Sequence, residues 1–116
     1  METQPVFKRA NWIQHTNIYE VNLRQYSAEG TFNAFADALP RLAAMGVQTL
    51  WFMPIHPIGK INRKGTLGSY YSISDFKAVN PEFGTAGDFK KLIALAHDTG
   101  MKVIMDWVAN HAAWDN

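Results

Sequence analysis

Three segments of the chain carry apolar residues in patterns that predict β-strands: residues 18–23 (IYEVNL), 47–53 (VQTLWFM) and 101–105 (MKVIM). The first alternates, with Tyr19, Val21 and Leu23 on one side of an extended chain, as a strand with one buried face does. The second is nearly continuously apolar up to Pro54, which is typical of a strand covered on both faces. The third ends directly before Asp106.

Between the first two strands, apolar residues recur at helical spacing, at Phe32, Phe35, Ala36, Leu39 and Ala43. This spacing predicts a helix with one buried face, whose first turn Thr31 caps through its hydroxyl. Pro40 interrupts the pattern because it lacks a backbone N–H and clashes with the carbonyl of Ala36. We therefore expect a kink or two short helices, ending near Gly46.

A second helix follows the turn at residues 80–84 (NPEFG). Thr85 and Asp88 have the spacing of a capping box, in which each side chain accepts a hydrogen bond from the other residue's backbone. The predicted core face holds Phe89, Leu92, Ile93 and Ala96, and the predicted water face holds Lys90, Lys91 and Asp98. Gly100 is expected to end this helix.

The predicted order is therefore β-α-β, a long loop, then α-β. Strands that alternate with helices are typical of an α/β fold with parallel strands joined by right-handed connections. The loop after the second strand runs for about thirty residues without clear periodicity, and loops of that length are usually functional. No linker or internal repeat divides the chain, so we expect residues 1–116 to form one structural unit.

Composition narrows the class of protein. With 47% hydrophobic and 18% charged residues the chain is globular rather than disordered. Its 11 basic and 10 acidic residues nearly cancel, so nothing suggests binding to nucleic acid or to an anionic membrane. Cysteine is absent, which excludes disulfides and thiolate metal sites. No signal peptide or membrane-spanning run is visible, which slightly favours a cytoplasmic location.

Polar residues gather where the predicted strands end, and in parallel α/β folds such ends surround one site. They are Asn22, Arg24 and Gln25 after the first strand, His56 after the second, and Asp106, Asn110 and His111 after the third. Two alternatives stay open: Asp106 could simply cap a following helix, and a lone His56 is more often a surface or internally bonded side chain. A metal site built from His56, Asp106 and His111 lacks ligand spacing that would place two on one face. Neither a glycine-rich phosphate loop nor a nucleophile elbow is present.

Two adjacent tyrosines, Tyr70 and Tyr71, lie in the polar long loop. Because two adjacent tyrosines in a polar, glycine-flanked loop are unusual as core residues, we expect one to pack inward and the other to face the cleft. An aromatic face suits a sugar ring, while polar groups nearby bond its hydroxyls. Together with Asp106, Asn110 and His111 the set predicts a carbohydrate subsite; the alternative is that both tyrosines only pack the loop.

Four stretches resemble the α-amylase family of glycoside hydrolases, in the right order and at the right spacing: residues 51–55 (WFMPI), 71–76 (YSISDF), 80–85 (NPEFGT) and 106–111 (DWVANH). The last is similar to the family's D-x-x-x-N-H motif on the third strand. The resemblance implies a partial TIM (β/α)₈ barrel, made of the first three parallel strands, two connecting helices and a long loop after the second strand. It also implies cleavage of α-glucosidic bonds with retention of configuration.

The same resemblance implies roles for individual residues. Tyr71 would stack on the sugar at the cleavage point, His111 would donate a hydrogen bond to a hydroxyl of that sugar, and Asp106 would orient the catalytic centre. Asn110 stands where calcium-bearing members often carry a metal ligand, which makes it a candidate calcium ligand; calcium use stays open at this point, because the family's other ligands lie further along its chain. Gly68 stands where exo-acting glucosidases of the family usually carry an aspartate, which argues against a strict exo-glucosidase.

The catalytic carboxyl groups of the family lie on later strands, so none is expected within this chain, and Asp106 only supports them. A barrel takes about 250 residues, so residues 1–116 are interpreted as the N-terminal fragment of a single catalytic barrel domain. We expect the isolated chain to be inactive, marginally stable and prone to self-association through its open sheet edge. The expected partner is an α-glucan or maltooligosaccharide substrate. The alternatives are a non-catalytic carbohydrate-binding or regulatory barrel relative, and a self-sufficient flavodoxin-like binding domain.

Overall fold

The computed structural model describes residues 8–109 and 111–116. Its strands β1 (Ile18–Val21), β2 (Thr49–Phe52) and β3 (Lys102–Met105) form one parallel sheet in the order β1-β2-β3. Val21 lies opposite Phe52, and Phe52 lies opposite Met105. This confirms the predicted parallel α/β arrangement. A flavodoxin-like sheet would place the first strand between the second and the third, so that alternative is wrong.

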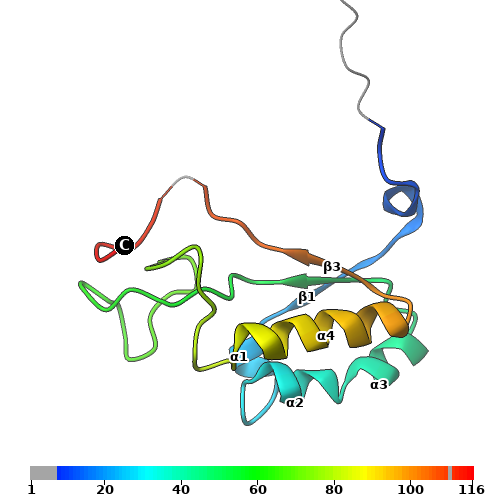
Figure 1. Cartoon of the computed structure of the whole chain (residues 1–116), viewed down its shortest axis with the longest axis horizontal. Coiled ribbons are helices and arrows are strands. Elements are labelled where there is room, and N and C mark those ends of the chain that lie inside the picture. Colours follow the sequence, from blue (N-terminus) through cyan, green and yellow to red (C-terminus); the bar gives the residue numbers. More distant parts are fainter. Residues whose placement is uncertain (1–7, 110) are drawn as a thin grey trace, which may run out of the picture.

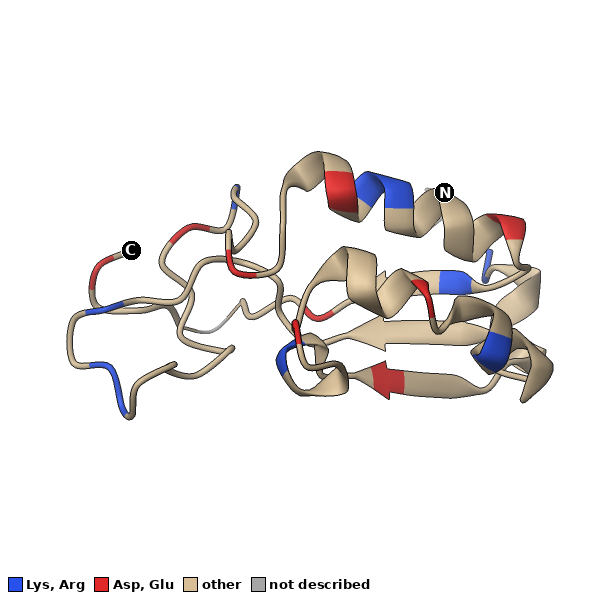
Figure 2. Cartoon of the chain, turned by 90° about the horizontal axis from the view of Figure 1, so that it is seen from below, with Lys and Arg blue, Asp and Glu red and all other residues tan. Residues whose placement is uncertain are grey.

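The helices are η1 (Asn11–His15), α1 (Leu23–Tyr26), α2 (Phe32–Ala36), α3 (Leu39–Ala44) and α4 (Ala86–Asp98). Figure 1 shows that α2, α3 and α4 lie on the same side of the sheet. None of the helices in the described ranges has the length and apolarity to cross a bilayer. Basic and acidic positions are interspersed over the helices and the long loop, as the sequence predicts (Figure 2).

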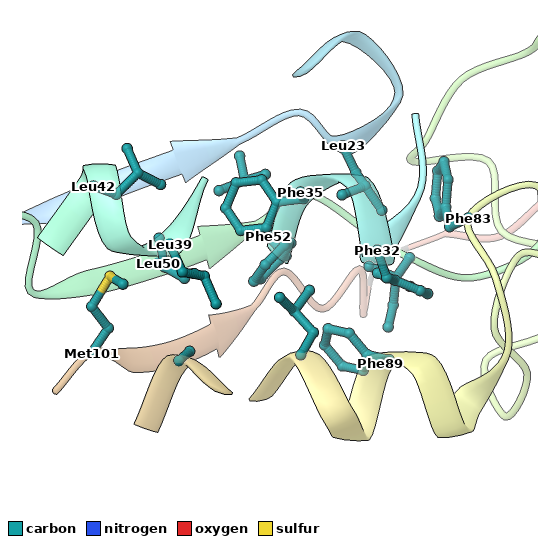
Figure 3. Packing of buried hydrophobic residues seen from close by; sticks show 14 of the residues in the cluster. Leu23, Phe32, Phe35, Leu39, Leu42, Leu50, Phe52, Phe83, Phe89 and Met101 are labelled. Carbon is teal, nitrogen blue, oxygen red and sulfur yellow. The ribbon is translucent and has the colours of Figure 1, made fainter. Parts of the chain in front are cut away.

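The core lies between the helices and the face of the sheet that carries Leu50 and Phe52 (Figure 3). Phe35 and Phe89 meet Phe52 edge to face, with ring centroids 5.4 and 5.8 Å apart. Burial of these side chains supplies the main driving force for folding this region. On the opposite face, Trp51 keeps part of its surface exposed, so β2 is only partly covered on its second face.

The helical segment after β1 is divided as Pro40 predicts. Thr31 caps α2, its Oγ1 accepting a hydrogen bond of 3.2 Å from the N–H of Ala34. The chain then turns, and Pro40 lies in the first turn of α3, where no intrahelical donor is needed. Leu42 is fully buried and completes the core face, whereas Ala43 is only half-buried.

The second predicted helix is α4, and its capping box is present. Thr85 Oγ1 accepts from the N–H of Asp88 at 3.0 Å, and Asp88 Oδ2 accepts from the N–H of Thr85 at 2.9 Å. Phe89, Leu92 and Ala96 are buried on the sheet side. The lysines of the predicted water face are exposed, and Gly100 follows the helix with a φ of 86°.

All three strands are shorter than predicted, because neighbouring elements use the backbone groups at their ends. Leu23 begins α1 instead of ending β1, because the chain turns into a helix directly after Val21, with the carbonyl of Asn22 accepting from the N–H of Gln25 at 3.2 Å. The N–H of Val47 donates to Leu42 and that of Met101 donates to Ala96, so both residues close helices before the strands begin. The short helices η1 and α1 were not predicted, because four or five residues give no readable period.

Candidate functional site

The three residues predicted to bind substrate border one cavity at the C-terminal end of the sheet. Tyr71, Asp106 and His111 line a space of about 370 Å³, together with Trp107, Val108 and Ala109. Tyr71 comes from the long loop and Asp106 from the end of β3, so the fold joins residues that are 35 positions apart. Their roles toward a substrate stay predictions; their proximity is a property of the structure.

Asp106 owes its place to the sheet. Its N–H donates to the carbonyl of Phe52 at 2.9 Å, which extends the pairing of β2 and β3 by one residue beyond Met105. The carboxylate therefore leaves the sheet at the strand end. No helix follows within residues 106–109 and 111–116, so the interpretation of Asp106 as a helix cap finds no support there.

The hydroxyl of Tyr71 donates a hydrogen bond to Asp106 Oδ2 at 2.8 Å. Burial raises the pKa of Tyr71 to about 12, and the hydrogen bond to Asp106, its negative charge and that of Glu20 act in the same direction. Tyr71 therefore keeps its proton at neutral pH. The phenol and the carboxylate form a fixed donor–acceptor pair at the edge of the cavity.

Tyr70 points away from the cavity, as expected for one of the two adjacent tyrosines. Its side chain is 8% exposed, and its ring stacks on Phe83 with centroids 6.0 Å apart. The Tyr70 hydroxyl donates to Asn22 Oδ1 and accepts from the N–H of Arg24 at 3.0 Å. Tyr71, by contrast, borders the cavity, and its role toward a sugar stays a prediction.

The other polar residues predicted at the strand ends support the loop rather than the cavity. Asn22 Nδ2 donates to Gln25 Oε1 at 3.3 Å, and Arg24 contacts the loop. His56 Nδ1 lies 2.9 Å from the carbonyl of Ala78, and its ring lies 5.9 Å from that of Phe76. None of these strand-end residues lines the cavity of Tyr71 and Asp106.

Sequence reasoning missed two features of this region. Trp107 lines the cavity with 75% of its surface exposed, although only the polar residues of its hexapeptide were singled out. In addition, the last residues return to the long loop: the N–H of Ala113 donates to Ile73 at 2.9 Å. Gly59 lies at this contact, where a Cβ would lie 2.3 Å from the Cβ of Ala113, but a glycine in a loop does not reveal in the sequence which residue approaches it.

The predicted calcium ligand, Asn110, lies outside the described residues. Within residues 8–109 and 111–116, no group of three or more histidine, aspartate or glutamate side chains is arranged to hold a metal ion. The residues described here do not by themselves make a calcium site, and bound calcium stays a prediction.

The family model for the alpha amylase catalytic domain matches residues 7–116. The alpha-1,4-glucan:maltose-1-phosphate maltosyltransferase of Rhodospirillum rubrum is 38% identical over 83% of this chain and 18% of its own length. The amino acid transporter heavy chain SLC3A1 of Mus musculus is 30% identical over 91% of this chain and 15% of its own length.

Among solved structures, an alpha-amylase from Lactobacillus plantarum superposes with a TM-score of 0.83 and 50% sequence identity, over 84% of this chain and 23% of that chain. The chain thus spans less than two thirds of the length of each of these proteins. Its parallel sheet, with helices packed on one side, has the architecture of a partial (β/α)₈ barrel. The chain belongs to the α-amylase family.

Proposed function

We propose that this chain is the N-terminal part of the catalytic barrel of an α-glucan-active enzyme. The enzyme cleaves α-glucosidic bonds of starch-type poly- or oligosaccharides with retention of configuration, as a hydrolase or a transglycosylase. The observation that supports this most is the pair formed by Tyr71 and Asp106 at 2.8 Å, in the cavity that His111 also lines. An aromatic ring beside hydrogen-bonding groups is the combination that a pyranose ring requires.

In this proposal the ring of Tyr71 stacks on the glucose unit at the cleavage point. His111 donates a hydrogen bond to a hydroxyl of that unit, and Asp106 orients it without attacking. Asp106 is the one acidic residue among the described residues that line the cavity. Because retention needs two carboxyl groups about 5–5.5 Å apart, we expect the isolated chain of 116 residues to cleave nothing.

The relatives support both forms of the reaction, since one is named a maltosyltransferase and another an alpha-amylase. These reactions share the cleavage step and differ in whether water or a second sugar accepts the glycosyl group. The similarity to an amino acid transporter heavy chain favours a second candidate, a barrel relative without catalysis. That candidate keeps the fold and needs no catalytic carboxyl groups.

The test uses the full-length protein, meaning the complete enzyme of which this chain is proposed to be the N-terminal part, with maltoheptaose as substrate. Proton NMR follows the anomeric configuration of the first product. We expect the α-anomer, and we expect Asp106→Asn to lower kcat/KM about 100-fold, since misplacing reacting groups by about 1 Å costs that much. Asp98→Asn, the same change at the exposed end of α4, should leave kcat/KM unchanged. Calorimetric binding of maltoheptaose without turnover would overturn the enzymatic proposal and support the second candidate.

A further inference from the structure

The loop that carries Tyr71 has almost no regular structure of its own. Between β2 and α4 the backbone forms one isolated antiparallel bridge, from Ile58 to Ile73, among the described residues. A segment of this length loses much conformational entropy when it is ordered, so specific contacts must offset that loss. Two arginines supply many of the contacts.

Arg24 reaches the loop from α1, at the C-terminal end of β1. Its Nη1 donates to the carbonyl of Gly68 at 3.1 Å, and its Nη2 donates to the carbonyl of Leu67 at 3.2 Å. Its Cζ lies 4.4 Å from the centroid of the Tyr70 ring, and its backbone N–H donates to the Tyr70 hydroxyl at 3.0 Å. Arg24 therefore contacts three residues of the loop: it bonds the backbone carbonyls of Leu67 and Gly68, and it contacts both the hydroxyl and the ring of Tyr70.

Arg63 holds the same loop from within. It donates to the carbonyls of Gly59 at 2.8 Å, Ile58 at 3.1 Å and Thr66 at 3.2 Å. These bonds close the loop on itself but leave its position relative to the sheet undetermined. The contacts of Arg24 differ because they join the loop to the end of β1.

The chemistry of these contacts requires arginine. In the described part of the chain no acidic side chain bonds Arg24, and its Nε is buried without a hydrogen-bond partner. Its charge is therefore directed at two carbonyl dipoles and the face of an aromatic ring. A planar guanidinium can meet all three at once, whereas a lysine ammonium is a compact and strongly hydrated charge that cannot.

We propose that Arg24 is a positioning residue that fixes residues 67–70 to the end of β1 and so places Tyr71 against Asp106. Tyr71 follows directly on the segment that Arg24 holds, and its hydroxyl meets a carboxylate at the end of β3. Arg24 itself is absent from the cavity lining, so it acts through the loop. The consequence for glucan cleavage rests on the proposed function; the placement of Tyr71 does not.

The experiment follows the ¹³Cζ resonance of Tyr71 in the full-length protein through an alkaline titration, with Tyr71→Phe to assign the signal. In Arg24→Met the loop should lose its hold, and Tyr71 should lose first its burial and then its carboxylate partner, so the pKa of Tyr71 falls from about 12 toward the ordinary 10.0. Arg24→Lys should lower the pKa of Tyr71 in the same way, because a single lysine ammonium cannot replace the planar guanidinium. Arg41→Met is the matched control: Arg41 also donates to a tyrosine hydroxyl, that of Tyr26, and within residues 8–109 and 111–116 its side-chain hydrogen bonds go to Tyr26 and Met45, not to the loop.

A second variant covers the case in which Arg24 variants fail to fold. Tyr70→Phe keeps the ring under the guanidinium and removes the hydroxyl that bonds Asn22 and Arg24, so the pKa of Tyr71 should again fall, by less. With maltoheptaose, Arg24→Met should lower kcat/KM at least about tenfold, as loss of orientation does, and Arg41→Met should not. Folded Arg24→Met and Tyr70→Phe proteins that both keep the pKa of Tyr71 at about 12 would overturn the proposal. If the unaltered protein cleaves no glucan, the proposed function fails while the titration still decides the role of Arg24.

Discussion

Phe35 and Phe52 lie between α2 and the sheet with no exposed surface, whereas residues 58–70 of the long loop are held by arginines that donate to backbone carbonyls. The first region is stabilised by apolar burial, which depends on area and hardly on direction. The second is stabilised by hydrogen bonds, which depend on distance and angle. The candidate site lies where the two meet, because Asp106 continues the sheet and Tyr71 belongs to the loop.

This difference shows how stability and precise geometry come from different interactions within one small unit. Burial of phenylalanines adds stability but does not specify where a polar group at the surface will lie. Directional bonds from Arg24 and Arg63 add less stability, yet they determine the path of the loop backbone. We therefore expect changes in the sheet region to alter stability most, and changes in the loop region to alter the geometry of the cavity.

The largest effect should come from the core. Phe35→Ala removes a fully buried ring that meets both Tyr26 and Phe52, so the free energy of unfolding should fall by about 3–5 kcal/mol. Urea denaturation of the full-length protein, followed by circular dichroism, measures the change. Ile61→Ala is the control in the loop, where the side chain is 57% exposed, and it should change the value by less than about 0.5 kcal/mol. Equal effects of the two substitutions would contradict the division into two regions.

The same substitution, glycine to alanine, should change the free energy of unfolding in opposite directions in the two regions. At Gly59 a Cβ would lie 2.3 Å from the Cβ of Ala113 and 2.4 Å from Asp115 Oδ1, so Gly59→Ala should cost about 1–3 kcal/mol. It should also separate the C-terminal residues from the loop and break the bond from the N–H of Lys60 to Asp115, so trypsin should cleave faster after Lys60, whose side chain is already exposed. At Gly87, in the first turn of α4, the nearest atom is 3.5 Å away, and Gly87→Ala should stabilise by about 0.4–1 kcal/mol. Thermal unfolding and limited proteolysis check both, and a destabilised Gly87→Ala would refute the contrast.

The sheet region could be predicted because its signals are local. The period of Phe32, Phe35 and Leu39, the break at Pro40 and the capping box of Thr85 each depend on residues a few positions apart. The grouping of Tyr71, Asp106 and His111 could also be predicted, because parallel strands bring their C-terminal ends together. The role of Arg24 could not, since its contact with Tyr70 spans 46 positions and no periodicity reports it. Strand ends were misplaced because the N–H groups of Val47 and Met101 bond back to the preceding helices, and the apolar pattern does not report such bonds.

The smallest effect tests the sheet region through a polar contact at its border, the capping box of α4. Thr85→Ala removes the acceptor for the N–H of Asp88 and should lower the free energy of unfolding by about 1 kcal/mol.

The hydrogen bond from the backbone N–H of Thr85 holds the pKa of Asp88 below its usual 3.8. A carboxyl group whose pKa is lower in the folded state contributes stability above the unfolded value, and this contribution disappears as the pH falls through the folded value. Unfolding measured in acid should therefore lose stability below about pH 3.8. In Asp88→Asn that part of the slope should be absent, whereas Asp98→Asn, at the far end of the same helix, should keep it. A slope that survives in Asp88→Asn would assign the acid sensitivity to another carboxyl group, such as Asp115, whose pKa is lowered by its bond from the backbone N–H of Lys60 in the loop.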